Sequence, residues 1–536
     1  MSNQKNNHIG GQWLCDNFNL HVVNPLAVVS NIGSRRHTVT TSDGAIETYQ
    51  EIMRPEATLR GHLTFHLKHE AISLEMLSRL FEKTSEVDLA NWIAKEPTSQ
   101  YAKRACFLFE WFTGKEIDLH GITVGGNYFD VLDPDDLVVA GNGKSDSRWR
   151  VRDNMPGTRE FCPTVRRTDA VRASMDLDCQ AMLNELKIEF GSEMLLKSAV
   201  WLTLRESRAS FKIEGEEGKK DRIQRFADVL HSLTGQASPP LDQKSLAMLQ
   251  SAILGVSTSI QQPGIRKSPV FIGQAIRYQE VVHYVAPPAE DVVGMLDGIR
   301  EFLNQTTGQS SIMRAAVASF GFVYVHPLAD GNGRVHRFLI NDILRRDGAV
   351  PEPLIIPVSG LITRDAEERK AYDQVLDSFS KPLMRAYASH YRLVDVPIDH
   401  DDGISSNFIF DANEDARHAW RFVDLTSHVQ YAGCVIEKTI HQEMRKEAVY
   451  LRSHFRAREV VKNLIEMPDH QVDRVIRSID QNNGALSGVL VKEVPILGQP
   501  GVWEKILDGV RTAFSTLNDE KPIETEARDD LPMSQS

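Results

Sequence analysis

The sequence predicts a mainly α protein with more than one domain. Apolar residues recur at helical spacing along much of the chain, as in ISLEMLSRLFEK and LLKSAVWLTLRESRASFKI. A chain of 536 residues that is 41% hydrophobic is longer than a single core accommodates, so two to four domains are expected. No repeat of fixed period is visible, which argues against solenoid and propeller architectures.

The first two blocks differ in their pattern. Residues 1–168 contain amphipathic helical stretches followed by shorter extended segments, which predicts an α+β domain; its polar, Arg-rich end, residues 150–168, is predicted to be a linker. Residues 169–395 have helical periodicity almost throughout. The exception is residues 268–288, where β-branched and aromatic residues around Gly273 predict a short hairpin.

The third block, residues 396–517, is predicted to be mainly helical. We expect one helix to Glu466, a break at Pro468, a second helix, and then short strands up to Trp503, an order that would suit a winged helix. Residues 518–536 are polar and acidic, which predicts a disordered tail.

Composition narrows the class of protein. The formal net charge of -12 disfavours a general nucleic-acid binder, although basic residues cluster between Arg445 and Arg458, as a solvated helix face or an interaction surface. No apolar run has membrane-spanning length and the N-terminus lacks the features of a secretory signal, so we expect a cytoplasmic protein without a membrane partner. The five scattered cysteines form no CxxC pair and are read as ordinary thiols.

The segment from His326 to Arg337, HPLADGNGRVHR, carries the chemistry. Gly331 and Gly333 flank Asn332 in a turn that lets backbone N–H groups face an anion, and the positive end of the following helix adds to that attraction. Arg334 and Arg337 lie three residues apart on one helix face and supply charge-assisted hydrogen bonds to further phosphates. The segment therefore predicts a polyphosphate site.

Two further side chains of this segment suit catalysis on a phosphate. Asp330 offers a hard oxygen ligand for Mg²⁺, and His326 can accept a proton from an attacking hydroxyl because imidazole is largely neutral at cellular pH. Each feature alone is common in turns and on surfaces. A histidine, an acid, a GNG turn and two arginines within twelve residues have little structural reason to coincide.

The order of these residues closely resembles the motif of the Fic family, His-Pro-Phe-x-Asp/Glu-Gly-Asn-Gly-Arg-x-x-Arg. The sequence departs from it only at Leu328, which should preserve loop packing while altering its shape. The resemblance implies a helical Fic-type core that transfers AMP from ATP to a Ser, Thr or Tyr hydroxyl of a target protein. The implied roles are the general base for His326, the Mg²⁺ ligand for Asp330, the α-phosphate and anion-hole group for Gly331, Asn332 and Gly333, and β- and γ-phosphate binding for Arg334 and Arg337.

A second resemblance lies upstream, in the helix near residues 197–215. Ser210, Glu214 and Gly215 match the family's inhibitory pattern, Ser/Thr-x-x-x-Glu-Gly/Asn. This implies that Glu214 pairs with Arg337 and keeps it from the γ-phosphate, so that the enzyme is off by default.

The predicted hairpin resembles the family's flap, which holds an extended target segment by backbone pairing. The residues implied are Val270, Phe271, Ile272 and Gly273, preceded by residues 263–266. Tyr372 and Ser359 lie where family members contact the nucleotide base or pack its pocket, and a core role for them is at least as well supported.

Two other patterns are set aside. Residues 141–145, GNGKS, end like a Walker A loop but lack its first glycine, and are predicted to be a surface turn. His326 and His336 have neither HExxH spacing nor a cysteine partner, so zinc is not predicted and His336 is taken as solvated or as a pocket neighbour.

The main hypothesis is an autoinhibited protein adenylyltransferase with ATP as substrate, Mg²⁺ as cofactor, and a target protein, itself or a homodimer partner included. One alternative keeps the site but removes AMP, with Glu214 positioning a water. The other is a DNA-binding regulator with a Fic-like sensor core, in which Arg456 and Arg458 contact DNA.

Overall fold

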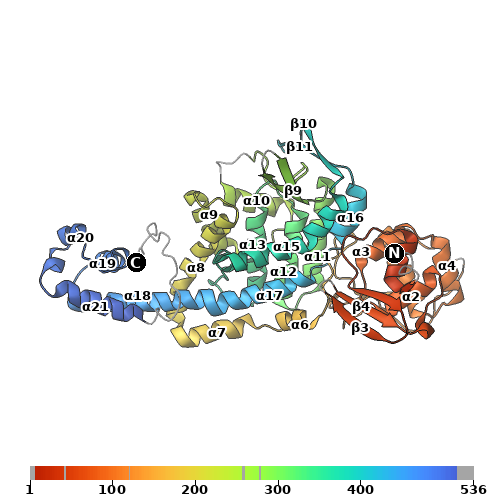
Figure 1. Ribbon diagram of the computed structural model, residues 1–536, viewed down its shortest axis with the longest axis horizontal. Coiled ribbons are helices and arrows are strands. Elements are labelled where there is room, and N and C mark those ends of the chain that lie inside the picture. The colour runs from red at the N-terminus through yellow and green to blue at the C-terminus, as the bar shows by residue number, and fades with distance from the viewer. Residues whose placement is uncertain (1–6, 42–43, 120, 256–259, 277–278, 516–536) are drawn as a thin grey trace.

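The computed structural model describes residues 7–41, 44–119, 121–255, 260–276 and 279–515. The molecule is elongated: an N-terminal region occupies one end, a helical body the middle, and a small group of C-terminal helices the other end (Figure 1). The prediction of a mainly α fold with an α+β N-terminal region is confirmed. None of the described helices is both long and apolar enough to cross a membrane.

The N-terminal region has its own hydrophobic core. A four-stranded sheet of order β1-β2-β4-β3 and a three-stranded sheet of order β5-β7-β6 accompany its helices. Its elements are β1 (His8–Ile9), α1 (Gly10–Phe18), β2 (Val28–Ile32), β3 (His37–Thr41), β4 (Gly44–Tyr49), the 3-10 turn η2 (Glu51–Met53), α2 (Leu59–His69), α3 (Leu74–Glu82), α4 (Glu86–Lys95), α5 (Gln100–Thr113), β5 (Phe129–Asp130), β6 (Lys144–Asp146) and β7 (Val151–Asp153).

The stretch predicted to be a linker, residues 150–168, is instead packed between the two regions. Phe161 and Cys162 are fully buried. The backbone N–H of Cys162 donates to the carbonyl of Arg421 (2.8 Å), and that of Thr164 to the carbonyl of Val423 (2.9 Å). Its polar and arginine-rich composition hid these apolar anchors, which fix the N-terminal region to the helical body.

The helical body surrounds α12, in which every residue from Ile312 to Val325 is buried. The neighbouring helices α11, α13 and α17 pack directly on it. Its elements are α6 (Asp169–Met175), α7 (Cys179–Phe190), α8 (Ser192–Ile213), α9 (Lys220–Leu233), α10 (Gln243–Leu254), β8 (Phe271–Ile276), β9 (Gln279–Val285), α11 (Ala289–Gln305), α12 (Ser311–Val325), α13 (Asn332–Arg346), α14 (Val358–Ile362) and α15 (Ala366–Tyr387).

The core of this body does not end at the predicted boundary near residue 395. It continues through a second hairpin, two further helices and the turn after them to Ala448, near the start of the next helix. The elements are β10 (Tyr391–Asp399), β11 (Ser405–Phe410), α16 (Asn413–Arg421) and α17 (Thr426–Lys438). Trp420 illustrates the reason: its indole is buried and donates to the carbonyl of Val285 at the end of the first hairpin (3.2 Å).

The C-terminal helices form a third core, reached along one extended helical run that begins with α17 (Figure 1). Its further elements are the π-helical turn η3 (Thr439–Met444), α18 (Arg445–Leu464), α19 (Asp469–Gln481), α20 (Gly488–Glu493), the 3-10 turn η4 (Pro495–Gly498) and α21 (Val502–Phe514). The predicted break at Pro468 is present, since this residue precedes α19.

The predicted strands of a winged helix are absent from the described part of this block, residues 396–515, after α19. α20, η4 and α21 take their place. Short apolar runs are ambiguous between strand and buried helix, and here the helix formed. Arg458 moreover pairs with Asp469 (3.2 Å) and Asp473 (2.8 Å), so it neutralises acids of its own lobe. The predicted tail, residues 518–536, lies outside the described residues.

Candidate active site

The predicted catalytic segment forms the loop between α12 and α13, at the centre of the helical body. α12 ends because His326 adopts the left-handed conformation (φ 49°, ψ 57°), while its N–H still donates to the carbonyl of Phe322 (2.9 Å). Pro327 follows and cannot continue a helix. Leu328, where the family motif has Phe, is fully buried and anchors the loop in the core.

The side chain of Asn332 closes this loop. Its Oδ1 accepts from the N–H of Leu328 (2.9 Å) and its Nδ2 donates to the carbonyl of the same residue (2.7 Å). The residue is buried, so both amide groups are committed to the backbone. Asn332 therefore shapes the turn with its side chain, and only its backbone N–H at the start of α13 can face an anion.

The ring of His326 is held in one tautomer. Its Nδ1 lies 3.1 Å from the carbonyl oxygen of Val323, which only accepts, so Nδ1 carries the proton and Nε2 keeps a free lone pair. Burial lowers the pKa of His326 to about 4, and the positive charge of Arg266 acts in the same direction. The imidazole is therefore neutral at pH 7 and able to accept a proton.

The start of α13 offers an anion cradle. Gly331 has a φ of 96°, a left-handed conformation that glycine adopts without strain, and it turns the chain into the helix. The free N–H groups of the first turn carry the positive end of the helix dipole. This is the group of backbone donors that the GNG turn predicts.

Arg334 and Arg337 lie beside the cradle and are almost fully buried, at 3% and 1% exposure. Among the described residues, Nε and one terminal nitrogen of Arg334 and one terminal nitrogen of Arg337 have no hydrogen-bond partner. Buried donors left without acceptors are costly. The geometry is thus that of a site for an anion with several acceptor oxygens.

The end of α8 lies against this pair of arginines. A guanidinium nitrogen of Arg337 contacts Oε1 of Glu214 at 2.7 Å, and its Nε donates to the hydroxyl of Ser210 (2.8 Å). Partial burial raises the pKa of Glu214, but the charge of Arg337 outweighs it, so the pKa lies below its ordinary value. A Cβ added at Gly333 would lie 2.2 Å from Glu214 Oε1, so the carboxylate stands directly over the cradle. Gly215 ends the helix with a φ of 69°.

A second carboxylate escaped the sequence reasoning. Glu216 lies 3.1 Å from a terminal nitrogen of Arg334 and also pairs with Lys219. The two arginines thus each have a carboxylate from the same turn at the end of α8. The run EGEEG was the available signal, because a glycine turn between two acids can direct both to neighbouring cations.

Asp330 is the residue that fits a metal. Its carboxylate is 41% exposed and lies 3.3 Å from Arg334. In the described ranges, no cluster of three or more His, Cys, Asp or Glu side chains could hold an ion by itself. One carboxylate at a phosphate cradle is nevertheless the usual protein contribution to Mg²⁺ that arrives with a nucleotide.

The predicted flap is a hairpin, as the sequence indicated, with β8 and β9 antiparallel. The segment before it pairs with the catalytic loop through a bridge between Ile265 and Leu328. Phe271 stacks on Phe408 of β11 (4.6 Å between ring centres), whereas Ile272 is exposed. The carbonyl of Val270 accepts from Ala286 and closes the base of the hairpin (3.1 Å). Gly273 pairs with Val282 just after a bulge.

Tyr372, Ser359 and His336, which the sequence connected to the site less specifically, lie in different environments. Tyr372 is buried, which raises the pKa of its hydroxyl, and the charge of Arg337 opposes that rise, so the side chain lies near Arg337. Ser359 is buried on α14 and bonds Glu206 of α8 (2.5 Å), which is a core contact. His336 is 1% exposed and packs on Phe320, so of its two predicted environments the solvated one was wrong and a place beside the pocket stays a prediction.

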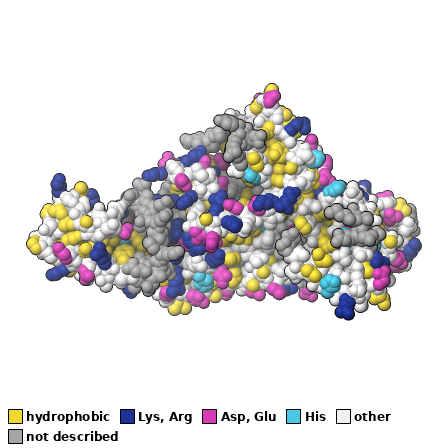
Figure 2. All heavy atoms as spheres, in the orientation of Figure 1, with side chains coloured by type: hydrophobic (Ala, Val, Ile, Leu, Met, Phe, Trp, Pro, Cys, Tyr) yellow, Lys and Arg dark blue, Asp and Glu magenta, His cyan; other side chains and the backbone are white. Residues whose placement is uncertain are grey.

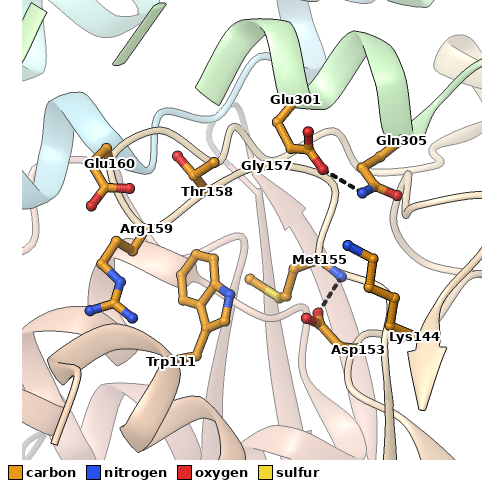
Figure 3. Close-up of a pocket in the computed structure, with 10 residues that line it drawn as sticks. All are labelled: Trp111, Lys144, Asp153, Met155, Gly157, Thr158, Arg159, Glu160, Glu301 and Gln305. Carbon is orange, nitrogen blue, oxygen red and sulfur yellow. Dashed lines mark hydrogen bonds between the residues drawn. The ribbon is translucent and has the colours of Figure 1, made fainter. Parts of the chain in front are cut away.

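A separate cavity of about 290 Å³ lies between the N-terminal region and α11, away from His326. Trp111 and Met155 line it, with Lys144 of the GNGKS turn at its side (Figure 3). None of the predicted site residues lines it. The cavity is therefore separate from the predicted catalytic segment in the α12–α13 loop.

The fold and the candidate site together describe a helical core that presents a neutral histidine beside two buried arginines at the start of a helix. Residues 240–344 match the model of the Fic/DOC family. Ser210, Glu214 and Tyr372 lie outside the matched residues.

Several relatives match part of the chain. The chain is 31% identical over 128 residues to "Protein adenylyltransferase fic-1" of Caenorhabditis elegans, covering 24% of this chain and 23% of the relative. It is 36% identical over 108 residues to the protein of the same name from Caenorhabditis briggsae, covering 20% and 19%. To "Protein adenylyltransferase Fic" of Drosophila willistoni it is 30% identical over 116 residues, covering 21% of each. The chain thus matches less than a quarter of the length of these relatives.

Two solved structures are similar at lower identity. A Fic family protein from Desulfovibrio desulfuricans G20 has 18% identity and a TM-score of 0.35, covering 66% of this chain and 88% of that one. A Fic domain containing signaling protein from Bacteroides thetaiotaomicron has 15% identity and a TM-score of 0.30, covering 52% and 94%.

Proposed function

We propose that the protein is an autoinhibited, cytoplasmic adenylyltransferase that moves AMP from ATP to a Ser, Thr or Tyr hydroxyl of a target protein. One observation carries the proposal: two nearly buried arginines have unpartnered nitrogens at the start of α13, next to a neutral histidine. The names of the relatives support the same activity.

Each site residue has a separate role in the proposed transfer of AMP. The backbone N–H groups from Gly331 to Gly333 bind the α-phosphate, and Arg334 and Arg337 bind the β- and γ-phosphates. Nε2 of His326 takes the proton of the target hydroxyl as its oxygen bonds to the α-phosphorus. The bond from that phosphorus to the β-phosphate bridge breaks, and pyrophosphate leaves.

Asp330 would hold Mg²⁺, which neutralises phosphate charge when bound. The exposed face of the hairpin, with Ile272, is where an extended target segment would pair by its backbone. Such pairing places a hydroxyl near the histidine without a strict side-chain code. The protein itself, or a second copy of it, is then also a candidate target.

Inhibition follows from the two carboxylates at the end of α8. Glu214 holds Arg337 and Glu216 holds Arg334, so a triphosphate meets negative charge where it needs positive charge. Glu214 also stands where an α-phosphate would lie over Gly333. ATP then binds without the arginine contacts that align it.

The direct test is labelling with ATP that carries radioactive α-phosphate, followed by mass spectrometry of a lysate and of the protein itself. Glu214→Gly should add AMP far more strongly than the unchanged protein, and adding His326→Ala should abolish the transfer. Equal and low labelling by Glu214→Gly and the unchanged protein would contradict the proposal, and activity in the double variant would remove His326 from the mechanism.

One observation favours removal of AMP as a second activity of the same site. The negative charge of Glu214 acts on His326, so a water between them could be oriented toward a phosphorus. Release of AMP from a modified target by the unchanged protein, lost in Glu214→Gln, would support this activity.

A further inference from the structure

Arg266 has an unusual environment for a charged side chain. It is 2% exposed, it lies just before β8, and in the described part of the chain no carboxylate comes within ion-pair distance of it. Its pKa is lowered by burial to about 10, so the guanidinium is charged at pH 7. A buried charge without a counter-ion is costly unless its hydrogen bonds are well placed.

The hydrogen bonds of Arg266 join three segments. Its Nε donates to the carbonyl of His326 (2.7 Å), and its two terminal nitrogens donate to the carbonyls of Ser268 (2.9 Å) and Pro287 (2.6 Å). Its backbone N–H donates to the carbonyl of Pro327 (2.9 Å). One planar group thus contacts the residue that carries the imidazole and both ends of the hairpin.

The bond to His326 has a specific consequence. A residue other than glycine in the left-handed conformation is strained, so His326 keeps this geometry only if its surroundings hold it. The conformation turns the carbonyl toward Arg266 and leaves the ring bonded to Val323 through Nδ1. Loss of the guanidinium contacts would release both the strained peptide and the base of the hairpin.

We propose that Arg266 is a positioning residue, which holds the backbone of His326 and the two ends of the β8–β9 hairpin in one arrangement, so that a target hydroxyl on the hairpin meets Nε2. This rests on the proposed transfer of AMP. Arg266 touches neither nucleotide nor target, and it acts through carbonyl oxygens. Lysine keeps the charge but cannot donate to three separate carbonyls in a plane, and methionine keeps only the bulk.

The first test uses self-labelling with AMP in the Glu214→Gly background. Arg266→Lys should reduce the rate of transfer at least tenfold while the ATP dissociation constant, measured by calorimetry, stays within twofold. Arg104 supplies a matched control: it is also buried and donates to the carbonyls of Val131 (2.8 Å) and Leu67 (3.1 Å), but in the N-terminal region. Arg104→Lys should lower the melting temperature without a selective loss of transfer. Unchanged transfer in Arg266→Lys, or equal losses of transfer and ATP affinity, would overturn the proposal.

The second test does not depend on activity. Histidine-labelled protein is followed by NMR, with the ring signals of His326 assigned by their loss in His326→Ala. In both Arg266 variants the Nδ1-protonated tautomer should be lost or averaged. Arg266→Met should also raise the midpoint of the His326 titration, and Arg266→Lys should not. In both variants Asp330 and Arg334 remain and Glu214 is absent, so these three residues are not the cause of a difference between the two midpoints. Spectra identical to the parent would overturn the proposal even if no AMP transfer were found, and a parent without transfer would separately refute the proposed function.

Discussion

Removing the carboxylate partners of Arg337 and Arg334 one at a time would show how the turn at the end of α8 restricts ATP binding. In Glu214→Gly, Arg337 loses its carboxylate partner and keeps its hydrogen bond to Ser210. In Glu216→Gln, Arg334 loses the negative charge beside it, while the side chain at position 216 keeps its shape. Both variants should bind ATP more tightly than the unchanged protein, and the double variant most tightly, because one triphosphate needs both guanidinium groups.

The structure sets the expected sizes. A charged hydrogen bond such as that between Glu214 and Arg337 contributes about 1.5–3 kcal/mol, which corresponds to roughly ten- to hundredfold in affinity. Glu216 has Lys219 as another partner and is partly exposed, so its removal should matter by only about 1 kcal/mol, or roughly fivefold.

Calorimetry of ATP binding, with the rate of AMP transfer measured in parallel, checks these values. Glu217→Gln is the control, since this exposed acid on the same loop should leave both quantities unchanged. The four proteins also form a double-mutant cycle. If Glu216→Gln leaves ATP affinity within twofold in the Glu214→Gly background, Arg334 is not obstructed and the account of two inhibitory carboxylates is wrong.

Three further predictions concern the same core. Gly333→Ala, made in the Glu214→Gly background so that the contact with Glu214 no longer matters, should reduce AMP transfer at least tenfold if phosphate approaches that backbone closely; transfer at the parent rate would place the phosphate elsewhere. His326→Ala, also made in the Glu214→Gly background, should abolish transfer while the ATP dissociation constant stays within threefold, and a large loss of affinity would instead give the ring a binding role. Burial lowers the pKa of His336 to about 4 and that of His428 to about 3, so the unfolded chain takes up these protons first as the pH falls below about 6.5. These two histidines should together lower the free energy of unfolding by about 3–4 kcal/mol between pH 7.5 and pH 5; burial of His62 and His326 acts in the same direction, and burial of Glu206, whose pKa is raised to about 7, acts in the opposite one. Denaturation curves that coincide at the two pH values would contradict this net loss.

The sequence was enough to predict how the central residues of the candidate site lie relative to one another, because they are contiguous. Gly331 and Arg334 stand within one helical turn, so their relative placement is almost independent of the rest of the fold. The contact between Glu214 and Arg337 spans 123 positions, and only the family pattern pointed to it. Hydrophobic periodicity alone would have placed Glu214 at the end of an amphipathic helix and given it no functional role.

Other features were beyond local patterns. Arg266 in PGIR looks like a surface arginine until the carbonyls of His326 and Pro287 are brought to it by the fold. The apolar residues of the last lobe fit either strands or helices, and burial of Trp503 in a helical lobe decided the outcome. Composition likewise misread the stretch around Phe161 as a linker: Phe161 and Cys162 are buried, and of its five arginines only Arg152 and Arg159 are exposed.

The order of the segments along the chain has a consequence for the newborn protein. A ribosome releases the end of α8, at Ile213, well before α13, which begins at Asn332. Because synthesis runs from the N-terminus, the acids at the end of α8 have already been synthesised when the arginines of α13 fold. Under the proposed mechanism, the inhibitory acids are present at every stage of synthesis at which the catalytic arginines are present. Activity therefore requires a later movement of the short turn at the end of α8.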